Sequence, residues 1–337
     1  MKKPVSRVAV VGTGTVGSSW TALYLARGLD VVASDPSSGA EAKLRHYVDT
    51  AWKALRIIGV SPKGSPEHLC FTTDPTEAVA DVDFVQESAP EEIDLKTHLF
   101  AELDAAAPAD SIIASSSASL TMSAIQAKCV HPERCVIAHP INPPHLVPLV
   151  EVVGGRKTSP STIQRTMAFY SAIGRKPIHV RKELIGHVAN RLQAALYREL
   201  AYLIEQEVLN VADADAAVCW GPGLRWGVMG PNMVFHLNAG EGGIHHFMEH
   251  FARSISACWS DLGHPELTRE LQQIIINGLM EEVGNQSLEK LVRDRDQLIL
   301  GLLRLRRKLG GLPKTSKKSP SSDALGRGKQ GARRRRR

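Results

Sequence analysis

Arg7-Val-Ala-Val-Val-Gly-Thr-Gly-Thr-Val-Gly17 is a run of apolar, β-branched residues that leads directly into a glycine-rich loop. A helical stretch follows over residues 18–27, and a second apolar run over residues 30–34 ends at Asp35. The glycine pattern alone is a weak signal. Its position between a strand and a helix, with an acid 18 residues after the last glycine, makes it a strong one. The stretch therefore predicts a dinucleotide-binding unit of strand, loop, helix and strand.

The loop has the residues that binding of a dinucleotide requires. The first glycine permits a tight turn, the second lets the backbone approach a diphosphate, and the third lets the helix pack closely on the strand. Free N–H groups at the start of the helix favour the anion. The Asp35 carboxylate accepts hydrogen bonds from ribose hydroxyls and repels a 2′-phosphate, so we expect NAD rather than NADP. The predicted contacts from the loop are Gly12, Gly14, Thr15, Val16 and Gly17.

The pattern of apolar residues changes near residue 155. Before it, short β-rich runs alternate with helical stretches, which is typical of a doubly wound, mostly parallel sheet. After it the pattern is helical, and the longest stretch covers residues 184–210. We therefore expect an α/β fold with an N-terminal Rossmann domain over residues 1–182, an all-α domain over residues 183–312, and a disordered basic tail over residues 313–337. The strand-like runs are 7–11, 30–34, 84–87, 111–115, 135–138, 149–153 and 177–180.

The positive charge of the chain is concentrated at its C-terminal end. Of the formal net charge of +6, residues 313–337 carry +9, so residues 1–312 carry −3. A polybasic tail binds nucleic acid or a membrane surface weakly. Apart from such binding by the tail, we expect no nucleic-acid partner. No apolar run reaches the ~18 residues of a membrane span, and no secretory segment is seen, so we expect a cytoplasmic protein. The 5 cysteines show no metal spacing and are expected to be reduced.

Polar residues follow the predicted strands at the edge where an open α/β sheet binds its ligands. His139 closes one such strand, and Glu151 lies inside the apolar run over residues 147–153. A carboxylate in an apolar strand is costly unless it is paired, and His139 is a suitable partner. Such a pair fits oxidation of an alcohol, because imidazole takes the hydroxyl proton while the carboxylate fixes its tautomer. From these residues alone, a structural histidine beside a solvated glutamate is an equally good interpretation.

These motifs, in this order and at these spacings, resemble the 3-hydroxyacyl-CoA dehydrogenase superfamily over residues 7–310. The matching elements are Gly12–Gly17, Gln86-Glu87, Lys96, Ala114–Ser117, His139–Asn142, Leu149–Glu151 and Gly186–Arg191. The resemblance implies that His139 is the general base, that Glu151 orients it, and that Asn190 helps to hold the substrate oxygen. The positions that correspond to cofactor contacts of the family are Glu87, Lys96, Ser115 and Asn142. It also implies a homodimer formed through the helical domain.

One position departs from the family pattern at the site. Ala118 stands where the family usually carries a serine that binds the substrate hydroxyl. Ser117 and Ser119 flank it, and either supplies a hydroxyl if the turn shifts slightly, although adjacent side chains point in different directions. We expect Ser117 to take a catalytic role and Ser119 to contact the substrate. An altered substrate or a less efficient enzyme is the alternative.

A second departure concerns the substrate. The acyl-CoA enzymes of the family clamp CoA with a long, lysine-rich helical excursion, whereas only 39 residues separate Asp35 from Asp74 here. The segment 220–231 resembles the L-gulonate 3-dehydrogenase (lambda-crystallin) and L-carnitine dehydrogenase branches, which act on small, CoA-free 3-hydroxy acids. Within it, Arg225 is expected to hold a carboxylate, and Trp226 to shape the pocket or face a cation. Helix packing is an equally good interpretation of both.

The sequence therefore predicts an NAD-dependent 3-hydroxy acid dehydrogenase. A 3-hydroxyacyl-CoA dehydrogenase is the second candidate, and an NAD-binding structural or regulatory protein with weak catalysis is a candidate of another class. No metal site is expected. His246 and His250 lie on one predicted helix face, but no HExxH arrangement accompanies them.

Overall fold

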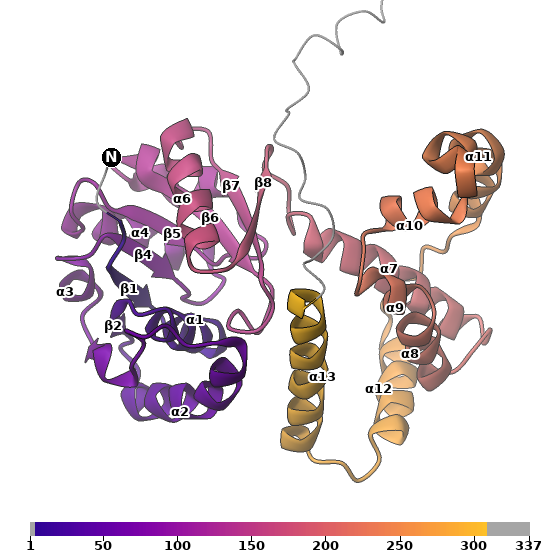
Figure 1. Cartoon of the computed structure of the whole chain (residues 1–337), viewed down its shortest axis with the longest axis horizontal. Coiled ribbons are helices and arrows are strands. Elements are labelled where there is room, and N and C mark those ends of the chain that lie inside the picture. The colour runs from indigo at the N-terminus through magenta and orange to yellow at the C-terminus, as the bar shows by residue number, and fades with distance from the viewer. Residues whose placement is uncertain (1–3, 309–337) are drawn as a thin grey trace, which may run out of the picture.

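The computed structural model describes residues 4–308 and consists of an α/β part joined to a helical part (Figure 1). One 8-stranded sheet has the order β3-β2-β1-β4-β5-β6-β7-β8. All neighbouring strands are parallel except β6 and β7, which are antiparallel. The strands are β1 (Arg7–Val11), β2 (Asp30–Ser34), β3 (Leu69–Thr72), β4 (Phe84–Glu87), β5 (Ile112–Ser115), β6 (Cys135–Pro140), β7 (Leu149–Gly154) and β8 (Lys176–Val180).

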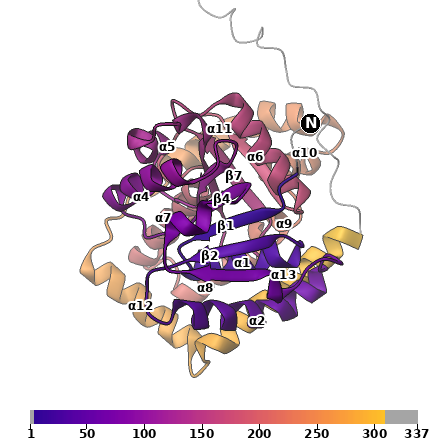
Figure 2. The ribbon, with the colours of Figure 1, turned by 90° about the vertical axis from the view of Figure 1, so that its left-hand side faces the viewer.

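Helices cover both faces of this sheet, because successive strand residues point to opposite sides and both sides are apolar. Val8 and Val10 belong to the core under α1, α2 and α6, whereas Ala9 and Val11 belong to the core under α4 and α5. Figure 2 shows β1 and β2 between the α4–α5 layer and the helix α2. These helices are α1 (Thr15–Ala26), α2 (Ala40–Ile58), α3 (Pro75–Val79), α4 (Ile93–Ala106), α5 (Met122–Ile125) and α6 (Pro160–Ala172). The predicted Rossmann architecture is confirmed.

The helical part extends away from the sheet, and its last helix, α13, returns to pack on α2 (Figure 1). Leu300 of α13 is buried there with Ile58 and Leu146. Elsewhere in this part most large apolar side chains are exposed, among them Trp220 at 80% and Trp259 at 70%. The helices are α7 (Ala189–Glu205), α8 (Val211–Trp220), α9 (Pro222–Trp226), α10 (Pro231–Asn238), α11 (Gly243–Asp261), α12 (Arg269–Val283) and α13 (Leu288–Lys308).

The long helix expected over residues 184–210 is shorter in the structure, where α7 covers Ala189–Glu205. Gly186 and His187 have φ angles of +74° and +47°, in the left-handed region, which stops a right-handed helix from extending towards residue 184. The boundary predicted between residues 182 and 183 lies in the segment that connects β8 to α7. No helix within residues 4–308 is long and apolar enough to cross a membrane. The predicted tail over residues 313–337 lies outside the described residues.

Candidate active site

The glycine loop between β1 and α1 leaves room for a dinucleotide. A Cβ on Gly17 would lie 1.8 Å from the Gly12 carbonyl oxygen, and a Cβ on Gly12, whose φ is +89°, would lie 2.7 Å from the Ser88 carbonyl group. Larger residues are therefore excluded at both positions. A Cβ on Gly14 would have nothing within 4 Å, so this position faces open space next to the N-terminus of α1. The loop thus fits a diphosphate, and Thr15 and Val16 lie in the first turn of α1, whose N–H groups favour it.

Asp35 follows β2 and is tied to this loop. Its Oδ2 accepts hydrogen bonds from the Thr13 backbone N–H at 2.8 Å and from the Thr13 hydroxyl at 3.0 Å. Its Oδ1 accepts from the Ser37 backbone N–H at 2.9 Å. Partial burial raises the pKa of Asp35, but these hydrogen bonds outweigh burial and lower it. The carboxylate is therefore ionised and held in place at the edge of the sheet.

His139 and Glu151 face each other across the antiparallel pair of β6 and β7. The Nδ1 atom of His139 lies 2.9 Å from Oε2 of Glu151, and the side chain of Glu151 is fully buried. Oε1 of Glu151 accepts from the backbone N–H groups of Val188 and Ala189, at the start of α7. Burial raises the pKa of Glu151, but the hydrogen bonds from His139 and from these N–H groups lower it below its usual range. An ionised Glu151 can only accept, so Nδ1 of His139 carries a proton and donates it in this hydrogen bond, which leaves Nε2 with a free lone pair.

His187 connects this pair to the loop after β5, and the sequence analysis missed it. Its ring is 5.2 Å from that of His139, and its Nε2 lies 3.0 Å from the Ser117 carbonyl oxygen. A carbonyl only accepts, so Nε2 carries the proton. Burial lowers the pKa of His187, which keeps the ring neutral beside His139. The only sequence signal was its position in the motif Gly186–Arg191, next to Asn190.

Glu87 and Lys96 form a buried ion pair, and neither side chain is exposed for contact with a ligand. The Lys96 Nζ lies 2.6 Å from Oε1 of Glu87, and both side chains are at most 1% exposed. Ser115 donates its hydroxyl to the other carboxylate oxygen of Glu87. In this arrangement the three residues expected to contact the cofactor bind one another and join the ends of β4 and β5.

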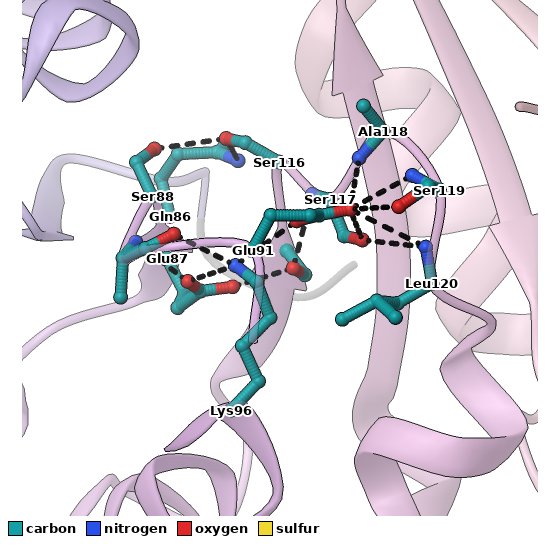
Figure 3. Close-up of polar contacts among 12 residues, drawn as sticks. Gln86, Glu87, Ser88, Glu91, Lys96, Ser116, Ser117, Ala118, Ser119 and Leu120 are labelled. Carbon is teal, nitrogen blue, oxygen red and sulfur yellow. Dashed lines mark hydrogen bonds and ion pairs between the residues drawn. The ribbon is translucent and has the colours of Figure 1, made fainter. Parts of the chain in front are cut away.

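Glu91 is the accessible carboxylate of this cluster, and the sequence analysis also missed it (Figure 3). Its Oε1 accepts from the hydroxyls of Ser117 and Ser119, at 2.6 and 2.9 Å. The same oxygen lies within 3.3 Å of the backbone nitrogens of Ala118, Ser119 and Leu120. Burial raises the pKa of Glu91, but these donors and the charge of Lys96 lower it to about 2. Both serine hydroxyls that flank Ala118 therefore donate to Glu91.

The two predicted asparagines, Asn190 and Asn142, lie in different segments of the chain. Asn190 is half-buried in the first turn of α7, one residue beyond the N–H groups that bind Glu151. It lines a shallow pocket of about 210 Å³ with Gln193, Ala194 and Tyr197. Asn142 is exposed and follows β6 after His139. Asn190 thus follows directly after the backbone N–H of Ala189 that binds Glu151.

Arg225 and Trp226 lie in the short helix α9, which contacts α13. The carbonyl of Gly227, directly after α9, accepts a hydrogen bond from Arg306 of α13. Trp226 is 39% exposed. Among the contacts of residues 4–308 given by the structure, none joins Arg225 or Trp226 to His139, Glu151 or Glu91. No group of three or more histidine, cysteine or acidic residues within that range could hold a metal ion.

Two family models match consecutive parts of this chain. The NAD binding domain of 3-hydroxyacyl-CoA dehydrogenase matches residues 7–184, and the C-terminal domain of the same family matches residues 186–270. This chain belongs to the 3-hydroxyacyl-CoA dehydrogenase family. The resemblance inferred from the motifs is thereby confirmed, and with it NAD as the cofactor. The enzyme is an NAD-dependent oxidoreductase of this family.

Relatives of this family member are L-carnitine dehydrogenases. That of Streptomyces griseus is 44% identical over 315 residues, which cover 94% of this chain and 93% of the relative. That of Pseudomonas putida is 44% identical over 299 residues, which cover 89% of this chain and 93% of the relative. The sequence analysis placed the chain near this branch of the family, and these relatives confirm that placement.

Solved structures of similar proteins agree with the fold. A 5-formyl-3-hydroxy-2-methylpyridine 4-carboxylic acid 5-dehydrogenase, described as an NAD⁺-dependent dismutase, has a TM-score of 0.76 and 28% identity, covering 92% of this chain and 100% of that chain. The 3-hydroxybutyryl-CoA dehydrogenase of Escherichia coli K12 has a TM-score of 0.63 and 26% identity, covering 82% of this chain and 57% of that chain. A Rossmann domain followed by a helical domain is therefore the shared architecture.

Proposed function

We propose that this family member oxidises a small 3-hydroxy acid of the carnitine or gulonate type to the corresponding 3-keto acid. The observation that carries the proposal is the His139–Glu151 pair, in which Nε2 of His139 is free. His139 lies near the carboxyl end of β6, and the glycine loop follows the carboxyl end of β1 in the same sheet. The names of the L-carnitine dehydrogenase relatives support the substrate class. The absence of a long excursion after Asp35 also favours a substrate without CoA.

His139 acts as the general base in the proposed reaction. Its Nε2 takes the proton of the substrate 3-hydroxyl, and Glu151 stabilises the imidazolium that forms. Asn190 holds the substrate oxygen from the first turn of α7. When bound, NAD supplies the hydride acceptor. The glycine loop and Asp35 are proposed to hold the cofactor. The other proposed contacts are Glu87 and Ser115 at the ends of β4 and β5, Lys96 in α4 and Asn142 after β6.

Substrate recognition is proposed for residues of both the α/β part and the helical part. Ser117 and Ser119 contribute hydroxyls near the reacting oxygen if Glu91 releases them. Arg225 is proposed to bind the substrate carboxylate and Trp226 to contact the rest of the substrate. Both roles require α9 to lie close to a substrate-binding site. Because α9 makes no described contact with His139, this role requires that assembly of the chain bring α9 to the substrate.

A homodimer formed through the helical part is the assembly that we propose. In a soluble monomer, large contiguous apolar surfaces are rare. Here α7 to α12 expose many large apolar side chains, including Leu192 at 67% and Phe251 at 48%. A second copy of the same surface would bury them symmetrically.

A weakly catalytic NAD-binding protein is the second candidate, and one observation favours it. The position of the substrate-binding serine is Ala118, and the hydroxyls of its two neighbours donate to Glu91. The site therefore has fewer free donors for a developing oxyanion than its motif suggests.

One assay separates the candidates. The purified chain is given NAD with L-carnitine, L-gulonate, 3-hydroxybutyrate or 3-hydroxybutyryl-CoA, and NADH formation is followed. Turnover of L-carnitine or L-gulonate at the highest kcat/KM supports the proposed function. Preference for 3-hydroxybutyryl-CoA would replace it by the acyl-CoA activity. Tight NAD binding with no turnover of any of the four would favour the structural or regulatory role.

A further inference from the structure

The hydroxyl of Ser116, directly after β5, has three polar neighbours (Figure 3 shows two of them). The indole N–H of Trp20 donates to it at 3.3 Å. The side-chain amide nitrogen of Gln86 donates to it at 2.9 Å. The hydroxyl of Ser88 lies 2.9 Å away on the opposite side, after β4. Ser116 therefore joins helix α1 to the ends of two neighbouring strands.

The orientation of Gln86 is set by two buried tyrosines. Its Oε1 accepts from the hydroxyls of Tyr24, at 2.9 Å, and of Tyr170. Burial raises the pKa of both tyrosines, so both hydroxyls keep their protons. With Oε1 occupied by two donors, the amide nitrogen of Gln86 is the group that faces Ser116.

These donors determine where the protons of the two serines go. A serine hydroxyl has two lone pairs and one proton. Trp20 and Gln86 fill both lone pairs of Ser116, so the Ser116 proton goes to the Ser88 oxygen. Ser88 is then an acceptor towards Ser116, and its own proton remains for another partner. Within residues 4–308, no protein acceptor for that proton is given by the structure.

Ser88 lies against the glycine loop. Its backbone N–H donates to the Val11 carbonyl at 2.7 Å, directly before Gly12. A Cβ on Gly17 would lie 3.3 Å from the Ser88 Cβ. Trp20, Tyr24 and Gln86 are fully buried, whereas Ser88 is half-buried. The hydrogen-bond chain thus begins in the core and ends at a partly accessible hydroxyl beside the dinucleotide loop.

We propose that the Ser88 hydroxyl is a cofactor-binding group that donates a hydrogen bond to an oxygen of the diphosphate–ribose part of NAD. Ser116, Gln86 and Trp20 are positioning residues, because they act on the cofactor only through Ser88. This chain of hydrogen bonds fixes the direction of the Ser88 hydroxyl before the cofactor binds. The entropy lost in ordering the hydroxyl on binding is therefore smaller. The contact is independent of which hydroxy acid is oxidised.

Calorimetric binding of NADH, ADP-ribose and AMP to the full-length chain tests this assignment. ADP-ribose contains the diphosphate and the second ribose, whereas AMP lacks both. We expect Ser88→Ala to weaken binding of NADH and of ADP-ribose about fivefold, the order of one net hydrogen bond, and to leave AMP binding unchanged. Ser171→Ala, on the exposed side of α6, is the matched serine control and should bind all three ligands like the wild type.

The role of Ser116 is tested by the double variant. Ser116→Ala alone should weaken NADH binding by a smaller factor, about twofold, because the Ser88 hydroxyl remains but is free to rotate. In the Ser88→Ala background it should have no further effect, since the residue through which it acts is gone. Binding of NADH and ADP-ribose within a factor of 1.5 of the wild type in Ser88→Ala, at unchanged melting temperature, would overturn the proposal. An undiminished effect of Ser116→Ala in that background would overturn the positioning chain.

Discussion

His139 and Glu151 are direct cross-strand partners in the antiparallel pair of β6 and β7, and their side chains meet at 2.9 Å. Because β7 runs antiparallel to β6, it begins at the edge where β6 ends, and this register places the glutamate opposite the histidine. The same carboxylate binds the first N–H groups of α7. One residue therefore orients the proposed base and anchors the helix that carries Asn190.

Replacement of His139 by alanine tests the base directly. We expect kcat on the best substrate of the panel to fall by a factor of about 10² to 10⁴, the usual contribution of a positioned general base. The dissociation constant of NADH should stay within about twofold of the wild type, since His139 does not contact the glycine loop. Turnover close to that of the wild type would exclude His139 as the base.

Glu151→Gln tests the orienting carboxylate. The amide cannot accept the Nδ1 proton with the same strength and loses the charge that stabilises the imidazolium, so kcat should fall by at least tenfold. Steady-state kinetics of the variant at pH 7, compared with those of the wild type, measure this loss; an unchanged kcat would contradict this role.

Ala118→Ser should raise activity. Ser117 and Ser119 both donate their hydroxyls to Glu91, so a serine at position 118 adds a donor that Glu91 does not already accept. A single additional donor to the reacting oxygen is expected to raise kcat by about tenfold or more. Ala118→Val adds bulk without a donor and should not raise it. Steady-state kinetics of the two variants decide the matter, and equal effects would rule out a missing hydroxyl.

Glu91 should stabilise the fold in a pH-dependent way. The pKa of its carboxyl in the folded chain is lowered to about 2, below the value of about 4.3 in an unfolded chain. The ionised form therefore favours folding at neutral pH, and this contribution disappears as pH falls from about 4.3 towards 2. In urea titrations, Glu91→Gln should unfold at lower denaturant concentration than the wild type at pH 7, and the two midpoints should converge at acid pH. A gap that does not change with pH would contradict this.

Asp35→Ala should change cofactor preference. The carboxylate repels the 2′-phosphate of NADP, so its removal should raise kcat/KM for NADP relative to NAD by about tenfold or more. It also removes three hydrogen bonds that hold Thr13 and Ser37, so affinity for NAD should fall. Kinetics with both cofactors measure the ratio. An unaltered ratio would show that Asp35 does not face the ribose.

The proposed dimer should depend on exposed apolar residues of the helical part. In sedimentation velocity at micromolar concentration, the chain of 36.7 kDa should sediment as a particle of about twice that mass. Trp259→Glu, at a side chain that is 70% exposed, should weaken the association if it lies in the interface, and Trp220→Glu provides a second position. A wild-type monomer at these concentrations would contradict the proposed assembly.

The sequence by itself determined the features that depend on neighbouring residues along the chain. The glycine loop, Asp35 and the alternating strands and helices follow from local steric and hydrophobic patterns, so the Rossmann domain and NAD could be predicted. The motif around His139 identified the family. The segment over residues 184–188 was assigned to a helix because its apolar spacing gives no sign of the left-handed backbone at Gly186 and His187.

Only the tertiary structure decided which distant side chains meet. Glu91 lies 26 residues from Ser117, and His187 lies 70 residues from it, yet all three are joined by hydrogen bonds. The sequence predicted Glu87, Lys96 and Ser115 as separate cofactor contacts, whereas folding places them in one buried cluster. Such contacts depend on how loops at the ends of β4, β5 and β8 approach one another, and residue spacing does not encode that approach. The glycine loop thus fixed the class of cofactor, and the packing of these loops fixed the chemistry placed beside it.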